Sequence, residues 1–151
     1  MDPLQCSVKG VFMAVGPLGA SPAVILSLDN TENCLPIYIG LWEAISIRNA
    51  LKQEIPPRPL THDLFVDLMR SFDIELKGLV IDSLDDGVYY ARLILEKDQR
   101  QVSMDCRPSD GIALSLRYGA DLLIDPDVAA SSAVEFKDIE GLQDLDAYLT
   151  G

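Results

Sequence analysis

Apolar residues recur along the first third of the chain in a pattern that changes from strand-like to helical. Residues 7–15, 22–28 and 35–39 are short apolar runs bounded by turn-forming residues, which predicts a hairpin followed by a third strand. Residues 41–54 instead place apolar side chains three to four positions apart, which predicts a helix. Prolines at positions 56–57 end this helix, because proline has no amide hydrogen to donate.

A second helix is predicted after this proline-rich loop. Thr61 suits the N-cap position, because its hydroxyl can accept a hydrogen bond from the first turn, and Asp63 suits the positive end of the helix dipole. Apolar residues then recur with helical spacing and predict one buried stripe, formed by Leu64, Phe65, Leu68, Met69 and Phe72.

The second half of the chain begins with three predicted strands. Residues 74–84, 88–97 and 101–106 are apolar runs separated by polar turns, and the Asp-Gly pair in the first turn is typical of a hairpin. We therefore predict an antiparallel meander. Residues 108–118 follow as a helix, with proline in its first turn and Gly119 just after its end, where glycine is favoured.

Two shorter elements complete the prediction, a strand at residues 121–124 and a terminal helix within residues 139–149. Because strands come in antiparallel runs with helices between them, the predicted fold class is α+β, with a mixed or largely antiparallel sheet and helices packed against it. The 151 residues are 48% hydrophobic, which is enough for one core. Residues 1–151 are therefore predicted to form a single compact domain.

The balance of charge limits the partners that this chain can bind. Twelve Lys and Arg residues against 24 Asp and Glu residues give a net charge of −12, which on average repels phosphate backbones and anionic lipid. Contact with nucleic acid would therefore need a local arginine cluster or a bridging metal ion. No apolar run approaches the ~20 residues of a membrane span, and the N-terminus lacks the basic start of a signal peptide, so no membrane contact is expected.

Cysteine and histidine usage narrows the chemistry further. Cys6, Cys34 and Cys106 are widely spaced and lie outside any CxxC pair, which argues against a disulfide framework and against a cysteine-rich zinc site. This usage favours a reducing compartment, and we expect the protein to be cytoplasmic. His62 is the only histidine, so zinc sites that need two histidines are excluded.

Two segments repeat the same order of side chains and are expected to lie together in the folded chain. Residues 58–63 and 105–110 each contain Arg-Pro, then a hydroxyl, then an aspartate, at the start of a predicted helix. Strand alternation places Asp105 and Arg107 on one face, where Asp110 could join them. Such a group suits Mg²⁺ or Mn²⁺ with a phosphate, because carboxylates bind hard cations and guanidinium binds phosphate.

Structural explanations account for the same residues without any catalysis. Asp110 can simply favour the positive end of its helix while Asp105 pairs with Arg107. Similarly, His62 is either a half-buried ring at a helix start or a general base that faces a phosphate. Strand alternation turns Cys106 toward the core, which disfavours a cysteine nucleophile paired with His62.

Four motifs in order resemble the bifunctional nuclease family. They are Leu35-Pro36-Ile37-Tyr38-Ile39-Gly40 with Glu43-Ala44, then Arg58-Pro59-Leu60-Thr61-His62-Asp63-Leu64, then Asp86-Gly87-Val88-Tyr89-Tyr90-Ala91, and finally Asp105-Cys106-Arg107-Pro108-Ser109-Asp110-Gly111-Ile112-Ala113-Leu114. The resemblance covers residues 8–128 and leaves 129–151 as a C-terminal extension. The family pattern has alanine at the positions of Cys106 and Gly111, and the glycine loosens the first turn of its helix.

The resemblance implies a nuclease that acts on RNA and DNA and assembles as a homodimer or higher oligomer. As catalytic residues it implies Glu43, His62, Asp63, Asp105 and Asp110. A divalent cation, Mg²⁺ or Mn²⁺, would be held by Asp105 and Asp110, and the substrate by Arg58, Thr61, Arg107 and Ser109. His62 or a metal-bound water would supply the base, and the acidic net charge favours a short oligonucleotide. The alternative is a non-catalytic oligomeric module that binds an anionic ligand or a protein partner through the same pocket.

Overall fold

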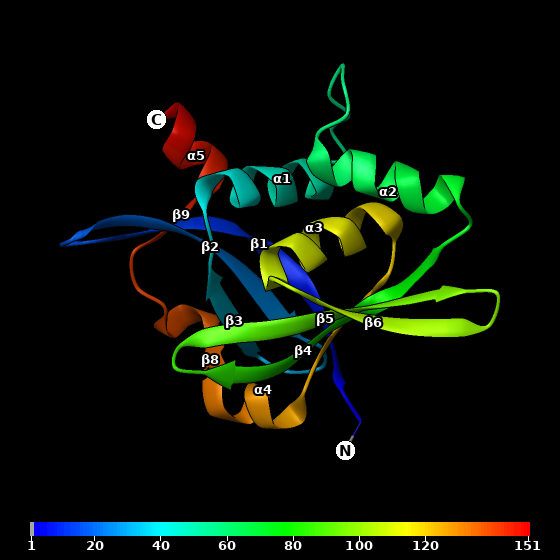
Figure 1. Ribbon diagram of the computed structural model, residues 1–151. Helices are drawn as coiled ribbons and strands as arrows, with labels where there is room; N and C mark the ends of the chain where they lie inside the picture. Colours follow the sequence, from blue (N-terminus) through cyan, green and yellow to red (C-terminus); the bar gives the residue numbers. More distant parts are fainter. Residues whose placement is uncertain (1) are drawn as a thin grey trace.

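The computed structural model describes residues 2–151, which form one mixed sheet with helices on both of its faces (Figure 1). The strands are β1 (Leu4–Gly16), β2 (Gly19–Leu28), β3 (Asn33–Tyr38), β4 (Glu75–Asp85), β5 (Val88–Lys97), β6 (Arg100–Cys106), β7 (Asp121–Ile124), β8 (Val134–Glu135) and β9 (Leu142–Asp144). The helices are α1 (Leu41–Leu51), α2 (Thr61–Ser71), α3 (Pro108–Tyr118), α4 (Pro126–Ser132) and α5 (Leu145–Thr150), with a 3-10 turn at Phe136–Asp138.

The sheet consists of two antiparallel halves that meet at β7. Across residues 2–151 the strand order is β6-β5-β4-β7-β1-β2-β3-β8, with β9 paired to β1. The pairing of β4 with β7 is parallel, and the other pairings are antiparallel. This arrangement confirms the predicted α+β class and the largely antiparallel sheet in a single compact domain.

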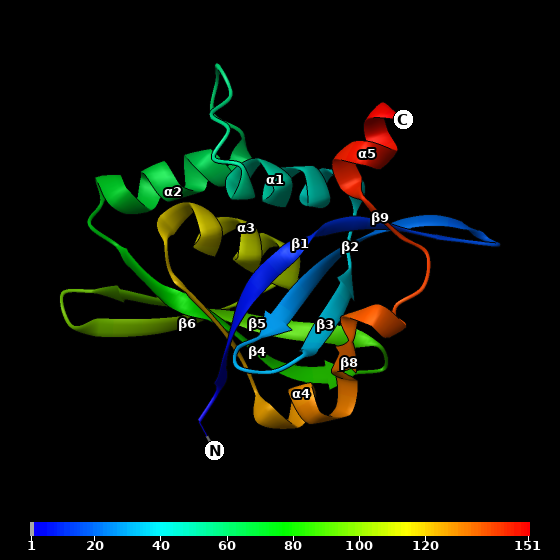
Figure 2. The same cartoon turned by 180° about the vertical axis from the view of Figure 1, so that it is seen from behind.

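Helix α3 is the central element of the layer that covers one face of the sheet. Helices α1, α2 and α3 lie on that face and α4 lies on the opposite face, as the two views in Figures 1 and 2 show. Ile112 and Ala113 of α3 are fully buried, together with Ile47 of α1 and Leu79 of β4. The start of α3 is therefore held rigidly between the sheet and the two other helices. No helix within residues 2–151 has both the length and the apolar character to cross a membrane.

Helix α2 departs from its predicted cap and from its predicted stripe. Its N-cap is Leu60 rather than Thr61, and the Asp63 carboxylate accepts a 3.0 Å hydrogen bond from the Leu60 amide. The buried residues of α2 are Val66 and Met69. The predicted apolar stripe is therefore only partly buried. Leu64, Leu68 and Phe72 remain 61%, 52% and 61% exposed.

The C-terminal part also differs from the prediction. The terminal helix begins at Leu145 rather than within residues 139–144, because residues 142–144 pair with β1 as strand β9. Helix α4 was not predicted; Asp125 caps it by accepting a hydrogen bond from the Asp127 amide. Pro126 occupies its first turn, where proline costs no hydrogen bond.

Candidate functional site

Helices α1, α2 and α3 bring polar side chains together at one place. Two come from α1, one from the first turn of α2 and two from the start of α3. We term this group the His62 cluster, and it consists of Glu43, Ser46, His62, Arg107 and Asp110. The two repeated segments of the sequence therefore meet in space, as expected, through His62 and Asp110.

The imidazole of His62 is the centre of the cluster. Its Nδ1 lies 2.6 Å from Ser46 Oγ, and its Nε2 lies 3.0 Å from Asp110 Oδ1. A carboxylate only accepts hydrogen bonds, so Nε2 donates to Asp110. With a neutral ring, Nδ1 then accepts from the Ser46 hydroxyl. A hydroxyl and a carboxylate thus hold the imidazole from its two sides. This arrangement fixes the orientation of the His62 ring, as in sites that transfer protons.

Arg107 joins the two carboxylates of the cluster. Its Nε and Nη2 donate to Asp110 Oδ2 and Oδ1 at 2.9 and 3.1 Å, and its Nη1 lies 3.1 Å from Glu43 Oε1. Burial alone would raise the pKa of Asp110, but the hydrogen bonds from Arg107 and His62 outweigh it and hold the pKa below its usual range. Asp110 is therefore ionised at neutral pH.

Exposure rises along the cluster from one end to the other. Ser46 is buried, the His62 side chain is 16% exposed, that of Asp110 is 32% exposed and that of Arg107 is 65% exposed. Arg107 is thus the group that a ligand from solvent meets first, and Asp110 is the next.

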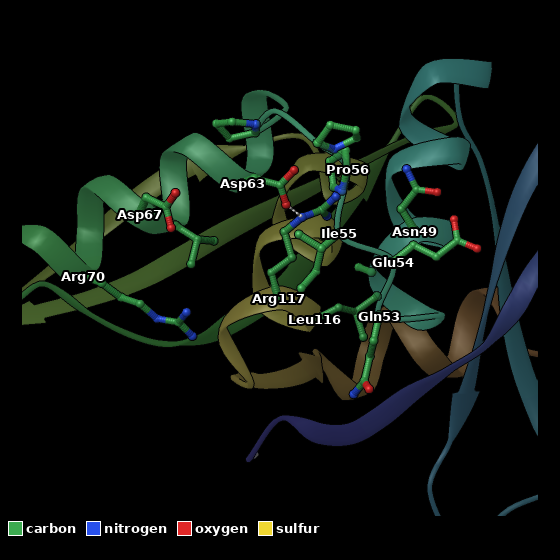
Figure 3. Close-up of a pocket in the computed structure, with 14 residues that line it drawn as sticks. Asn49, Gln53, Glu54, Ile55, Pro56, Asp63, Asp67, Arg70, Leu116 and Arg117 are labelled. Carbon is green, nitrogen blue, oxygen red and sulfur yellow. Dashed lines mark hydrogen bonds and ion pairs between the residues drawn. The ribbon is translucent and has the colours of Figure 1, made fainter.

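Asp63 does not belong to this cluster. Its Oδ1 accepts a 2.8 Å hydrogen bond from Arg117 Nε, and Arg117 Nη1 donates to the Ala113 carbonyl at 3.0 Å. The Arg117 side chain is only 10% exposed. The pair lines a cavity of about 760 Å³ between α1, α2, α3 and the proline-rich loop that includes Pro56 (Figure 3). Asp63 therefore fastens α2 to α3 beside His62.

Asp105 also lies apart from the cluster. In β6 it stands opposite Arg92 of β5, whose Nε donates to Ser103 Oγ, so these three side chains share one face of the sheet. Cys106 points to the other face, where it packs near Gly111 of α3. The structure therefore brings Asp110 to His62 but leaves Asp105 on the far face.

The remaining predicted residues have separate surroundings. Arg58 lies in the exposed loop before α2 and forms no ion pair within residues 2–151, and Thr61 is the exposed first residue of α2. Ser109 is 5% exposed at the start of α3. Within residues 2–151, neither the Arg58 nor the Thr61 side chain forms a hydrogen bond or ion pair with the His62 cluster.

The donor set does not fit the divalent cation that the sequence suggested. Within residues 2–151 no three His, Cys, Asp or Glu side chains are grouped as metal ligands. The carboxylates that do meet, those of Glu43 and Asp110, are bound to the Arg107 guanidinium through Glu43 Oε1 and both oxygens of Asp110, so a positive charge already occupies the place of a cation.

The Cys106 thiol is half-buried against the core. Burial, reinforced by the charges of Asp105 and Asp110, raises its pKa to about 11, so the reactive thiolate is scarce at neutral pH. Its Sγ lies 3.2 Å from the place where a Cβ on residue 111 would sit. Leu79 of β4 lies closer still to that place, so Leu79 and Cys106 together fill the space that Gly111 leaves free.

Two residues of the site were missed at the level of sequence. Ser46 lies one helical turn after Glu43, on the same face of α1, so the choice of Glu43 as a candidate could have pointed to it. Arg117 is a basic residue in the last turn of α3, where a positive charge is common for structural reasons alone. Nothing in the sequence indicates that Asp63 is its partner.

Comparison with known proteins shows which family this chain belongs to. The family described as the bifunctional nuclease domain matches residues 24–137. A Mycobacterium tuberculosis protein named Uncharacterized protein Rv1829 is 39% identical over 119 residues, which are 78% of this chain and 70% of that protein. Bifunctional nuclease 1 from Oryza sativa subsp. indica is 23% identical, and Bifunctional nuclease 2 from subsp. japonica is 24% identical.

The two rice proteins are much longer than this chain. The match covers 75% of this chain in both cases but only 35% and 36% of the respective rice proteins. The family match itself extends over more than half of the chain and includes the His62 cluster. The chain therefore belongs to the bifunctional nuclease domain family.

Proposed function

We propose that this protein is a nuclease that hydrolyses phosphodiester bonds at the His62 cluster. One observation carries the proposal: in a domain of this family, His62, Asp110 and Arg107 come from two distant segments and form one continuous hydrogen-bonded group that reaches the surface. The group therefore places a carboxylate that can act as a base next to a guanidinium that can bind an anion.

Arg107 binds the phosphate in this proposal. A guanidinium donates two parallel hydrogen bonds to a phosphate, and Arg107 is the most exposed member of the cluster. Glu43 and Asp110 hold its position from two sides before substrate arrives. A phosphate at Arg107 is thereby placed beside Asp110.

The Asp110 carboxylate receives the proton of the attacking water. Asp110 is partly exposed and ionised, so it can orient a water toward the phosphorus. His62 Nε2 already carries the hydrogen that it donates to Asp110 Oδ1 at 3.0 Å, so the ring holds the carboxylate in place while Asp110 acts as the base, and the leaving oxygen takes its proton from solvent. Ser46 is a positioning residue, since its hydroxyl bonds only to Nδ1 and fixes the ring.

A water nucleophile also supports activity on both RNA and DNA. Attack by water does not require the ribose 2′-hydroxyl, so the same cluster can cleave either backbone. The net charge of −12 disfavours long backbones, which makes short strands the favoured substrates.

The test is a cleavage assay of the full chain on short RNA and single-stranded DNA. His62→Gln removes the ring that holds the Asp110 carboxylate in place and should lower the rate by about 100-fold, the usual cost of displacing a catalytic group. Asp98→Asn, in the exposed β5–β6 turn, is the matched control and should cleave at the parent rate. Equal rates for His62→Gln and the parent would refute the proposal. Binding of anions without any cleavage would support the non-catalytic module instead.

A further inference from the structure

A second cavity lies next to the His62 cluster and shares Arg107 with it. It measures about 510 Å³ and lies between the end of β3, the β4–β5 turn and the start of α3. Its volume falls within the ~300–1,000 Å³ typical of small-molecule sites. No step of the proposed hydrolysis uses this second cavity.

The lining of this cavity combines aromatic rings with a phosphate-binding group. Tyr38 and Tyr89 line it together with Arg107 and Ser109. Tyr38 is 60% exposed, although a tyrosine that served only the core would be covered. Apolar residues such as Pro22 and Val88 line the rest of the cavity.

Ser109 adds a hydroxyl group to the lining of this cavity. Only 5% of the residue's surface is exposed, so its position at the start of α3 is fixed by the surrounding packing. The Ser109 hydroxyl can donate a hydrogen bond to a bound molecule.

We propose that this cavity binds one unstacked nucleobase of a single-stranded substrate, with the base against Tyr38 and Tyr89 and the adjoining phosphate at Arg107. This inference rests on the proposed nuclease function, because it identifies the kind of nucleic acid strand whose phosphate Arg107 holds beside Asp110. Tyrosine rings stack on any base, so the site is tolerant of sequence and of the sugar. Bases in a duplex are paired and stacked, so a duplex cannot supply one without opening.

The acidic surface makes this mode of binding the favourable one. With a net charge of −12, affinity cannot come from a long row of phosphate contacts. Stacking needs no positive surface. A single phosphate contact at Arg107 should give a slope of about −0.7 when the logarithm of the binding constant is plotted against the logarithm of salt concentration.

The experiment is fluorescence anisotropy of the full chain with a labelled single-stranded tetranucleotide and with the same strand made abasic at its central positions. Tyr38→Ala should bind the normal strand about 5- to 150-fold more weakly, the range expected for one lost stacked base, and the abasic strand as the parent does. Tyr90→Ala is the matched control, because this exposed neighbour of Tyr89 does not line the cavity.

The outcomes separate this inference from the proposed function. Equal affinity of Tyr38→Ala and the parent for the normal strand, or equal affinity of the parent for the normal and abasic strands, would overturn the base site. A parent that binds no strand would overturn it as well. If instead Tyr38 contributes to binding as expected but no strand is cleaved, the base site stands and the nuclease function fails.

Discussion

Replacement of Asp63 by Asn tests whether the pair that joins α2 to α3 is structural. The change keeps an oxygen that can accept from the Leu60 amide but removes the charge that faces Arg117 Nε at 2.8 Å. Arg117, with a 10% exposed side chain, then keeps only the Ala113 carbonyl as partner. A cation left without its counter-charge in such surroundings costs more than the ~0–1 kcal/mol of an exposed pair and less than the ~3–5 kcal/mol of a fully buried one.

We therefore expect Asp63→Asn to lower the free energy of unfolding by about 2 kcal/mol at neutral pH, between those two limits. In a domain of this size that corresponds to a fall in Tm of about 4–8 °C. Asp63→Ala should lose about 1 kcal/mol more, because it also removes the acceptor for the Leu60 amide. Urea unfolding of the three proteins measures these differences.

The loss of stability caused by Asp63→Asn should depend on pH in a definite direction. Burial opposes ionisation of Asp63, but the hydrogen bonds from Arg117 and from the Leu60 amide hold its pKa below the usual aspartate range. A carboxyl with a lowered pKa in the folded state contributes stability above its unfolded pKa and loses it as pH falls through the folded pKa. The gap between parent and Asp63→Asn should therefore shrink below about pH 4. A gap under about 0.5 kcal/mol at neutral pH, the range of ordinary surface changes, would refute the reasoning, as would a gap that does not change with pH.

Two other outcomes follow from the packing. Gly111→Ala should lower the free energy of unfolding by about 1–3 kcal/mol, because the added Cβ would clash with the buried side chain of Leu79 and also crowd Cys106 Sγ. Adding Cys106→Ala should recover only the smaller part of this loss, since Leu79 stays in place, as a double-mutant cycle would show. The exposed apolar row on α2 is expected to bind a second copy of the chain, so light scattering should give a mass above 16.6 kDa, and Leu64→Glu with Leu68→Glu should return it to that value. A parent mass of 16.6 kDa at all concentrations would contradict this expectation.

The elements with strong local signals were predicted from sequence. Residues 88–97, 108–118 and 121–124 have the same bounds in the structure, because Asp-Gly turns, first-turn proline and a C-terminal glycine act within a few residues. Gly119, with a φ of 86°, occupies the left-handed conformation that its position predicted. Strand β9 was not predictable in this way, because its three residues become a strand only by pairing with β1.

The sequence predicted which residues form the candidate site better than it predicted how these residues are arranged in space. Two similar helix starts were enough to select His62, Asp110 and Arg107, since charged groups at helix ends are unusual in a core. Sequence alone could not show that Asp110, in the first turn of α3, reaches His62 while Asp105 ends on the far face of β6. That choice depends on how α3 packs against α1 and α2, which is a tertiary property.

The comparison of Asp110→Asn with Asp105→Asn in one cleavage assay tests the central claim most directly. Both variants remove one carboxylate charge, but only Asp110 is bonded to His62 and Arg107. We expect Asp110→Asn to cleave short single-stranded RNA and DNA at least about 100-fold more slowly than the parent, as for a lost general base, and Asp105→Asn to cleave at a rate close to that of the parent. Equal loss in both variants, together with abolition of activity by EDTA, would contradict the account and would support a cation held by the two aspartates.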